Sequence, residues 1–131
     1  MVCLDTSFII DLLRGNNKIQ SLVRQLGGSS EDISVASPTI VEIVRGLKIG
    51  NFREGESEKV NELLSSLNVL NLDKESAILA GNVEADLIRK GEIIELEDIL
   101  IGAIALHNNQ TLITKNHKHF SRIKNLKVMG Y

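Results

Sequence analysis

Short apolar runs alternate with longer amphipathic stretches along the 131 residues of the chain. Each apolar run is only four or five residues long and lacks strict alternation of apolar and polar positions. Runs of this kind are typical of strands that are covered on both faces of a parallel sheet. The pattern predicts strands over residues 1–4, 33–36, 68–72, 111–114 and 126–129.

The stretches between these runs repeat their apolar positions at helical spacing. They predict helices over residues 6–14, 17–26, 56–67, 74–90 and 97–107, with another that begins at Pro38 and a short one after Asn116.

Residues with capping preferences mark several of the predicted helix ends. Ser37 and Asp73 are favourable N-cap residues, and Pro38 suits the first helical position. Gly15 and Gly91 follow the last apolar positions of their helices, where glycine favours termination. Strands that alternate with helices predict an α/β fold with helices layered around a parallel sheet.

Composition and length narrow the class of protein. Hydrophobic residues make up 43% and aromatic residues only 3%, which predicts a folded core built from Leu, Ile and Val. The polar stretches 27–32 and 50–58 are short enough to be loops within one domain, so we expect a single domain over residues 1–131.

Charge and cysteine usage add two expectations. The formal net charge of −2 is no basic nucleic-acid footprint, although bound cations would offset local negative charge. The single cysteine, Cys3, cannot form an internal disulfide, and we expect it to be a small buried hydrophobe. Neither a signal peptide nor an apolar stretch of ~18 residues is evident, so we expect a soluble cytoplasmic protein without a membrane span.

Asp5 stands where the first predicted strand ends and the first predicted helix begins. In open α/β sheets, functional sites gather at the carboxyl ends of strands. Aspartate is also a good N-cap, and the residues around Asp5 do not decide between these two roles.

Glu42 lies early in the helix that follows the second predicted strand. On a helical wheel, Ile40, Ile43, Val44 and Leu47 form the predicted core stripe, and Glu42 falls on the opposite side. A solvated glutamate near a helix N-terminus is the ordinary explanation. Gly46 lies four residues further on, on the same face. Glycine inside a helix costs about 1 kcal/mol relative to alanine, and this cost is easier to understand where another group must approach the backbone closely.

Asp98 interrupts EDILIGAIAL, a segment that is apolar nearly all round and is therefore expected to be a buried helix. A buried carboxylate must be paired, hydrogen-bonded, protonated or bound to metal. As with Glu42, a glycine, Gly102, follows four residues later. Three converging carboxylates would repel one another unless a cation lay between them, and oxygen ligands suit Mg²⁺ or Mn²⁺.

With these acids in place, the sequence resembles the PIN-domain ribonucleases, and in particular the VapC-type toxins of toxin–antitoxin pairs. The resemblance runs over essentially the whole chain. The stretches that carry it, in the family's order, are LDTSFIIDLL, SPTIVEIVRG, EDILIGAIAL and LITKNHKHF.

The resemblance implies a three-layer α/β/α sandwich with a short central parallel sheet. It implies an endoribonuclease that cleaves RNA phosphodiester bonds with Mg²⁺ or Mn²⁺. Asp5, Glu42 and Asp98 match the acids that hold metal in the family. Asp5 and Asp98 would hold the ion, and Glu42 would bind it or orient the attacking water. The matching supporting positions are Thr6, Ser7, Thr114 and Asn116.

The chain departs from the family near Asn116, where many members carry a fourth acid. Only Asn116 and His119 are available there, so the number of metal ions stays open. Asn116 is equally suited to be a helix N-cap. The cations near the motifs, which would contact phosphates or simply lie on the surface, are Arg14, Arg45 and Lys115.

The family also implies a homodimer and a VapB-like protein antitoxin as partners, besides the RNA substrate. Two alternatives remain open. One is a receiver-like phosphoryl-transfer domain with Asp5 as acceptor, which Asp73 and Lys115 favour slightly. The other is an RNA-binding or protein-interaction module of the same fold that does not cut.

Overall fold

The computed structural model describes residues 1–26, 33–50 and 54–131. The stretches 27–32 and 51–53, which belong to the two predicted loops, lie outside the described residues. Within the described ranges, every predicted strand is present to within two residues at either end. The strands are β1 (Val2–Leu4), β2 (Ile33–Ala36), β3 (Asn68–Leu70), β4 (Thr111–Thr114) and β5 (Lys127–Gly130).

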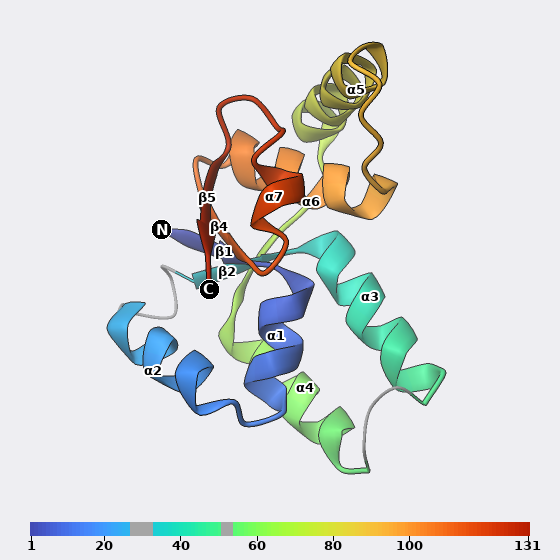
Figure 1. Ribbon diagram of the computed structural model, residues 1–131. Helices are drawn as coiled ribbons and strands as arrows, with labels where there is room; N and C mark the ends of the chain where they lie inside the picture. The colour runs from blue at the N-terminus through green and yellow to red at the C-terminus, as the bar shows by residue number, and fades with distance from the viewer. Residues whose placement is uncertain (27–32, 51–53) are drawn as a thin grey trace.

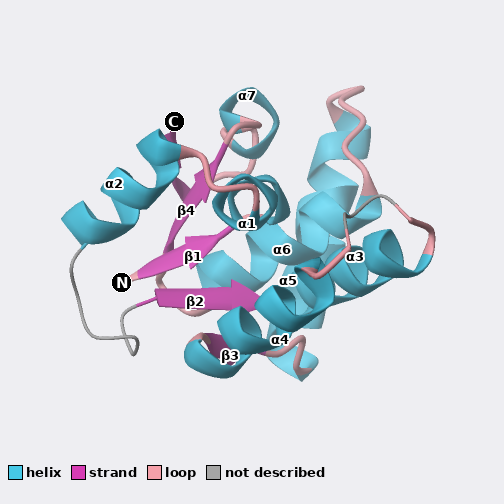
Figure 2. Ribbon diagram, turned by 90° about the horizontal axis from the view of Figure 1, so that it is seen from below, coloured by secondary structure: helices cyan, strands magenta, loops and turns pink. Residues whose placement is uncertain are grey.

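The five strands form one sheet in the order β3-β2-β1-β4-β5, and every neighbouring pair is parallel. The predicted parallel sheet is therefore confirmed. Figure 2 shows β1 between β2 and β4, with Leu4 in register with Val35 on one side and Ile113 on the other. The chain moves outward from β1 in one direction to β2 and β3, and then returns to place β4 on the opposite side.

Helices follow each strand except the last described one. They are α1 (Thr6–Leu13), α2 (Asn17–Leu26), α3 (Ser37–Lys48), α4 (Glu56–Ser66), α5 (Lys74–Arg89), α6 (Leu96–His107) and α7 (His117–Phe120).

The sheet carries apolar side chains on both faces, as its continuous apolar strands require. Leu4 and Ile113 pack with α1, α2 and α4, whereas Cys3 and Leu112, one residue earlier in each strand, pack with α6 and α7. Figure 1 shows the sheet edge-on between these two helical layers, with α5 packed on the outer side of α6. The expected three-layer α/β/α sandwich is confirmed, and Cys3 is the buried hydrophobe that was expected.

Local capping explains where α5 begins and where α1 and α5 end. The Asp73 carboxylate accepts the Ser76 backbone N–H at 2.8 Å, and the Ser76 hydroxyl accepts the Asp73 backbone N–H at 2.9 Å. This reciprocal capping box satisfies two donors that the helix leaves free. Gly15 and Gly91 follow α1 and α5 with φ of +74° and +72°, a left-handed conformation that favours glycine.

Two expectations for α3 are wrong. Ser37 is the first residue of the helix and not its N-cap; Ala36 holds that position, and the Ser37 hydroxyl instead accepts the Leu72 N–H at 3.3 Å. The predicted apolar stripe is also displaced. Thr39, Ile43 and Gly46 are buried, whereas Val44 is 41% exposed.

The displacement has a physical reason. The helix α3 contacts both α1 and α6, so it buries two flanks and not one stripe. A helical wheel built for a single apolar face cannot anticipate such a position.

Among the helices of the described residues, none combines the length and the hydropathy that a membrane crossing requires.

Candidate active site

The strand order places the expected ligand-binding crevice of such a sheet at the carboxyl ends of β1 and β4. In an open parallel sheet, the strand order reverses at one point, and there the loops after two adjacent strands lead away to opposite faces of the sheet. Ligands bind between these loops. In this chain that point lies between β1 and β4. Asp5 follows β1, and its backbone N–H donates to the Ile113 carbonyl at 3.0 Å. Thr114, the last residue of β4, lies beside it.

Asp5 is only 3% exposed, and its side chain points toward β4. The Thr114 hydroxyl donates to Asp5 Oδ2 at 2.7 Å, and the Ser7 hydroxyl donates to the same oxygen at 3.3 Å. Asp5 occupies the N-cap position of α1, yet its side chain makes no capping hydrogen bond. Burial raises the pKa of Asp5, and the bonds from Thr114, the Thr6 N–H and Ser7 oppose that increase.

Glu42 projects from the second turn of α3 toward α1. The Thr6 hydroxyl donates to Glu42 Oε1 at 2.7 Å, and the same hydroxyl oxygen lies 3.3 Å from the buried Thr39 hydroxyl. Burial is the main cause that raises the pKa of Glu42; the Thr6 bond lowers it, and the negative charges of Asp5 and Glu97 raise it further. Glu42 is therefore half-buried and held in place, and not a solvated surface residue.

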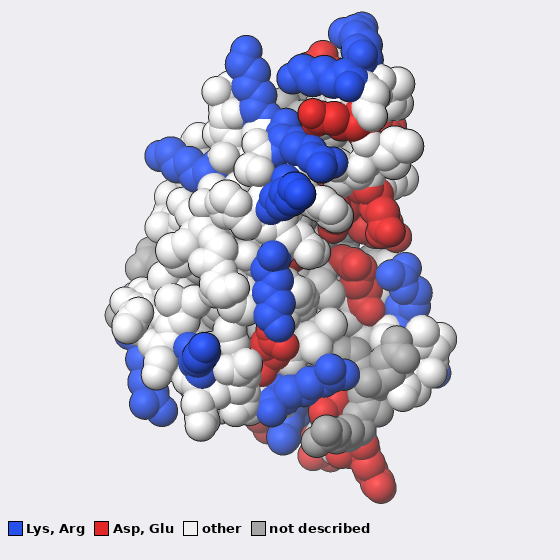
Figure 3. All heavy atoms as spheres, in the orientation of Figure 1, with Lys and Arg blue, Asp and Glu red and all other residues white. Residues whose placement is uncertain are grey.

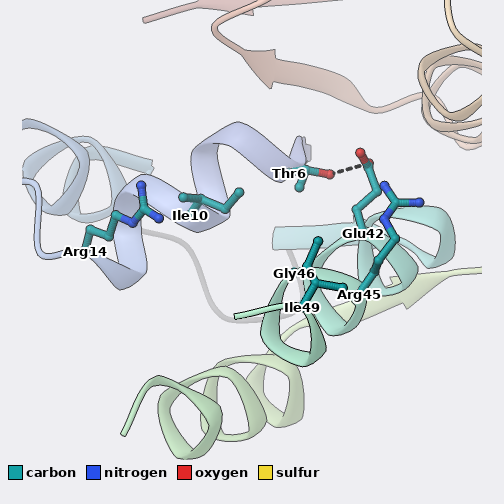
Figure 4. A pocket seen from close by; sticks show the side chains of 7 residues that line it. All are labelled: Thr6, Ile10, Arg14, Glu42, Arg45, Gly46 and Ile49. Atoms are coloured by element: carbon teal, nitrogen blue, oxygen red, sulfur yellow. Dashed lines mark hydrogen bonds between the residues drawn. The ribbon is translucent and has the colours of Figure 1, made fainter. Parts of the chain in front are cut away.

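A cavity of about 360 Å³ opens beside Glu42. Figure 4 shows the Glu42 carboxylate turned toward Thr6 across the space between α1 and α3. Gly46, four residues after Glu42, is buried in α3 and lies in the wall of this cavity. The lining residues are Thr6, Ile10, Arg14, Glu42, Arg45, Gly46 and Ile49.

Asp98 lies in the first turn of α6 and is half-buried. Its pKa is raised to about 6, first by burial and then by the negative charges of Asp5, Glu42, Glu95 and Glu97, in this order. Within the described ranges its carboxylate makes no hydrogen bond or ion pair. Asp98 is thus a partly desolvated carboxylate that faces other carboxylates.

The glycine of the same helix has a different role from the one its spacing suggests. A Cβ atom at Gly102 would collide with the Ile123 side chain and contact Leu126 and Phe120. Gly102 therefore admits the segment after α7 into the core, and it does not line the crevice. The same spacing of acid and glycine in α3 and α6 therefore gives the two glycines different surroundings: Gly46 lines the cavity, whereas Gly102 packs against Ile123.

Asp5, Glu42 and Asp98 are close enough for each pair to raise a pKa through repulsion. Among the described residues, however, the group of three whose ligand atoms all lie within 4.8 Å of one another is a different one. It consists of Asp73, Glu75 and His107, which are all exposed. Asp5, Glu42 and Asp98 are therefore near enough to influence one another's charge, but their ligand atoms do not all lie within 4.8 Å of one another.

The supporting residues fall into two groups. Thr6, Ser7 and Thr114 bond directly to the acids, as described above. Asn116 lies at the N-cap position of α7, but its side chain makes no capping bond, and its backbone N–H donates to the Thr114 hydroxyl at 2.9 Å. Asn116 and His119 are both exposed. A role for Asn116 or His119 in place of the family's fourth acid stays a prediction.

The candidate phosphate contacts have protein partners of their own. Arg45 lies 3.6 Å from Glu97, and Lys115 pairs with Asp11 at 2.5 Å. Arg14 lines the cavity beside Glu42. Within the described residues, Lys115 pairs with Asp11 and Asp73 with His107, and neither side chain forms a hydrogen bond or ion pair with Asp5. The polar groups that favour a receiver-like domain therefore do not bond to the proposed acceptor.

Sequence reasoning does not single out several polar residues that the fold brings to this region. Thr39 is fully buried next to Thr6, and Glu95 and Glu97 add negative charge beside Asp98. The Tyr131 hydroxyl lies 3.1 Å from Asp11 Oδ2 and 3.4 Å from the Ser7 hydroxyl. The acid-rich ELED segment is a sequence signal for the glutamates; nothing local signals Tyr131, because its partners lie more than 100 residues away.

Comparison with known proteins agrees with this architecture. The family model described as "PIN domain" matches residues 2–126. The chain belongs to the PIN domain family. Within it, the chain is of the VapC type, being 30% identical over 131 residues to Ribonuclease VapC1 of Methanocaldococcus jannaschii, a match that covers 99% of this chain and 86% of that protein.

Two further matches extend the comparison. The tRNA(fMet)-specific endonuclease VapC of Salmonella typhimurium is 26% identical over 125 residues, covering 95% of this chain and 93% of that protein. A crystal structure of VapBC2 from Rickettsia felis bound to a DNA fragment from their promoter superimposes with a TM-score of 0.90. It is 26% identical in sequence, and the match covers 100% of this PIN domain and 99% of that chain.

Proposed function

We propose that this PIN domain is a divalent-metal-dependent endoribonuclease that cleaves RNA phosphodiester bonds and acts as the toxin of a toxin–antitoxin pair. The observation that carries the proposal is the gathering of Asp5, Glu42 and Asp98 at the carboxyl edge of the sheet. They stand on three different elements, and burial is the main cause that raises the pKa of each; the charge of Asp5 raises the pKa of Glu42 and Asp98 further. Relatives named as VapC ribonucleases support the nuclease reading.

The donor set suits a hard divalent cation. All of the candidate ligand atoms are carboxylate or hydroxyl oxygens, and Cys3, the one thiol, is buried in the core. Mg²⁺ keeps several water ligands and is commonly held by only one or two carboxylates, so direct ligation by all three acids is not required. Asp98, which lacks a hydrogen-bond partner within the described residues, would gain the most from a cation.

The roles of the residues follow from their contacts. Asp5 and Asp98 would hold Mg²⁺ or Mn²⁺. When bound, such an ion would make water more acidic and stabilise negative charge on the scissile phosphate. Thr114 and Ser7 both bond Asp5 Oδ2, so Oδ1, to which neither hydroxyl donates, would be the oxygen that holds the ion. Thr6 holds Glu42 Oε1, so that Oε2 would orient the attacking water or bind the ion.

The partners follow from the relatives and stay proposals. The matched solved structure contains a VapBC pair, which supports a VapB-like protein antitoxin for this chain. We also propose that residues 1–131 act as one PIN-like domain, that the chain forms a homodimer, and that it works in the cytoplasm. The VapC relative that is named for tRNA(fMet) supports structured RNA as the first substrate class to assay.

The test is metal-dependent cleavage by the antitoxin-free protein. Structured RNAs would be incubated with Mn²⁺ or Mg²⁺ and with the wild type, Asp5→Asn or Asp98→Asn. We expect cleavage by the wild type, its loss in EDTA, and a decrease on the order of 10²–10³-fold in either variant. Asp73→Asn is the matched control, since it changes an acid of the exposed group and should leave the rate unchanged. Equal cleavage by all the variants would show a contaminating nuclease and would remove the proposal.

The wider spacing of the acids favours a second candidate, an RNA-binding module of the same fold that does not cut. It predicts RNA binding that EDTA and Asp5→Asn leave unchanged, without cleavage in either metal. The receiver-like alternative has no such support and would need a stable phosphoaspartate at Asp5.

A further inference from the structure

Opposite charges are segregated along the chain. The last of the 17 Asp and Glu residues is Asp98, and no acid follows it up to Tyr131. Five of the 15 Lys and Arg residues lie in that same acid-free segment. They are Lys115, Lys118, Arg122, Lys124 and Lys127. A net charge of −2 for the whole chain therefore hides a region of concentrated positive charge.

The cationic part of this segment begins next to the candidate active site. Thr114, which bonds to Asp5, ends β4, and α7 begins three residues later. Phe120 and Ile123 are buried in the core beneath α6 and anchor the segment. With those two side chains turned inward, Lys118 and Lys124 are turned out and exposed, and Arg122 is partly so. We call Lys118, Arg122 and Lys124 the cationic ridge.

Figure 3 shows how the charges lie on this face of the molecule. Lys and Arg side chains gather over α7 and the loops around it, and Asp and Glu side chains gather beside them over the start of α6 and over α3. The carboxylates of Glu95 and Glu97 contribute to that acidic side, since both act on Asp98. The candidate active site thus has an acidic flank on one side. On the other side the cationic ridge begins near the site at α7 and runs from there toward the start of β5, at the amino edge of the sheet.

In the described part of the chain, no acidic side chain pairs with the ridge cations. Among the described residues, none of the three forms an ion pair, whereas Arg45 and Arg89 each lie within 4.0 Å of a carboxylate. Neighbouring like charges without counter-charges repel one another, and a polyanion would relieve that repulsion.

A protein partner fits this surface poorly. Protein interfaces are built around apolar and aromatic side chains at their centre. The large exposed hydrophobic residues of the described part of the chain include none between 99 and 130, and they lie mainly on α3, α5 and the segment before α6. The ridge offers charge without an apolar anchor, which suits a phosphate backbone.

We propose that the cationic ridge binds the phosphate backbone of the RNA on one side of the scissile bond, so that the substrate approaches the acids from the α7 side. The inference rests on the proposed ribonuclease function. The acidic flank repels phosphates, and the ridge holds the strand that leads into the crevice. Backbone contacts position the substrate without reading its sequence, so the ridge sets affinity and not the choice of cleavage site.

The test compares two triple variants of equal charge. The ridge variant is K118Q/R122Q/K124Q. The control variant is R24Q/K59Q/K74Q, which removes three exposed cations from α2, α4 and α5 that also form no ion pair within the described residues. Each is combined with Asp98→Asn to prevent cleavage, and the Kd for fluorescent single-stranded and hairpin RNAs of several sequences is measured across a series of salt concentrations.

We expect the ridge variant to bind every RNA about 10–100-fold more weakly and to lower the slope of log K against log salt by roughly 2–3, since each lost phosphate contact removes about 0.7–0.9. The control variant should lose less than about twofold. In the background that retains Asp98, the ridge variant should cleave with a raised KM.

Each contrary result has one meaning. If the wild type cleaves RNA but the two triple variants show equal Kd and salt slope, the ridge proposal is wrong and the ribonuclease proposal stands. If the wild type neither binds nor cleaves RNA in Mn²⁺, both are wrong. If the ridge variant keeps its RNA affinity but loses binding of the antitoxin protein, the surface belongs to that protein and the ridge proposal is wrong.

Discussion

Two acidic groups in this molecule differ in a way that bears on how metal sites are found. Asp73, Glu75 and His107 have ligand atoms within 4.8 Å of one another, yet all three are exposed. Asp5, Glu42 and Asp98 are spaced more widely, yet they are buried or half-buried. The short distances between ligand atoms favour the first group as a metal site, whereas the burial of the carboxylates favours the second.

The pKa directions separate the two groups. Hydrogen bonds from the Ser76 backbone and hydroxyl lower the pKa of Asp73, so its ionised form is already satisfied by the helix it caps. Burial and neighbouring carboxylates raise the pKa of Asp98, so its ionised form is not satisfied. A group that the protein leaves electrostatically unsatisfied is the better candidate for a functional cation site.

The largest expected effect is on stability in the presence of metal. At a Mn²⁺ concentration of about 100 times Kd, binding adds about 2.7 kcal/mol, which would raise the Tm of the wild type by roughly 10 °C. We expect Asp98→Asn to lose this shift in thermal unfolding and His107→Ala to keep it. A shift that follows His107 and not Asp98 would assign the ion to the exposed group.

A smaller effect is expected when the Asp73 cap is removed. Asp73→Ala breaks the capping box of α5 and should lower the Tm in EDTA by roughly 2–5 °C, while RNA cleavage stays unchanged. Asp86→Ala is the control, because Asp86 makes only an exposed pair with Arg89 and should change the Tm by less than about 1 °C. Loss of cleavage in Asp73→Ala at a temperature where it is folded would mean that this group has a catalytic role.

The smallest effect concerns the pH dependence of the metal-free protein. The folded pKa of Asp98 is raised to about 6 from the ordinary value of 3.8. The protonation of Asp98 therefore adds to the free energy of unfolding. This contribution is fully present below pH ~4 and is lost as the pH rises through about 6. Asp98→Asn should therefore stabilise the EDTA-treated protein above pH 6, by less than about 1 kcal/mol because the side chain is half-exposed, and not at pH 4. Equal stability of both proteins at pH 7.5 in urea unfolding would mean that Asp98 is not electrostatically strained.

Much of the fold follows from local pattern. Each strand was predictable from a short apolar run, and the capping box at Asp73 and the glycines after α1 and α5 are properties of neighbouring residues. The errors occurred where a residue depends on distant elements. Thr39 and Gly46 are buried because α3 lies between α1 and α6, and Gly102 is required by Ile123, which lies 21 positions later.

The candidate site divides in the same way. The sequence alone determined which acids interrupt apolar segments, because an unexplained carboxylate in a strand end or a buried helix is visible without coordinates. It also determined the family, through motifs in order. Only the tertiary structure decided that Thr114 holds Asp5, that Thr6 holds Glu42, and that the acid-free segment borders the crevice on one side. These contacts join residues 36 to 109 positions apart. They exist because the parallel sheet gathers the ends of distant strands at one edge, and no local pattern encodes that arrangement.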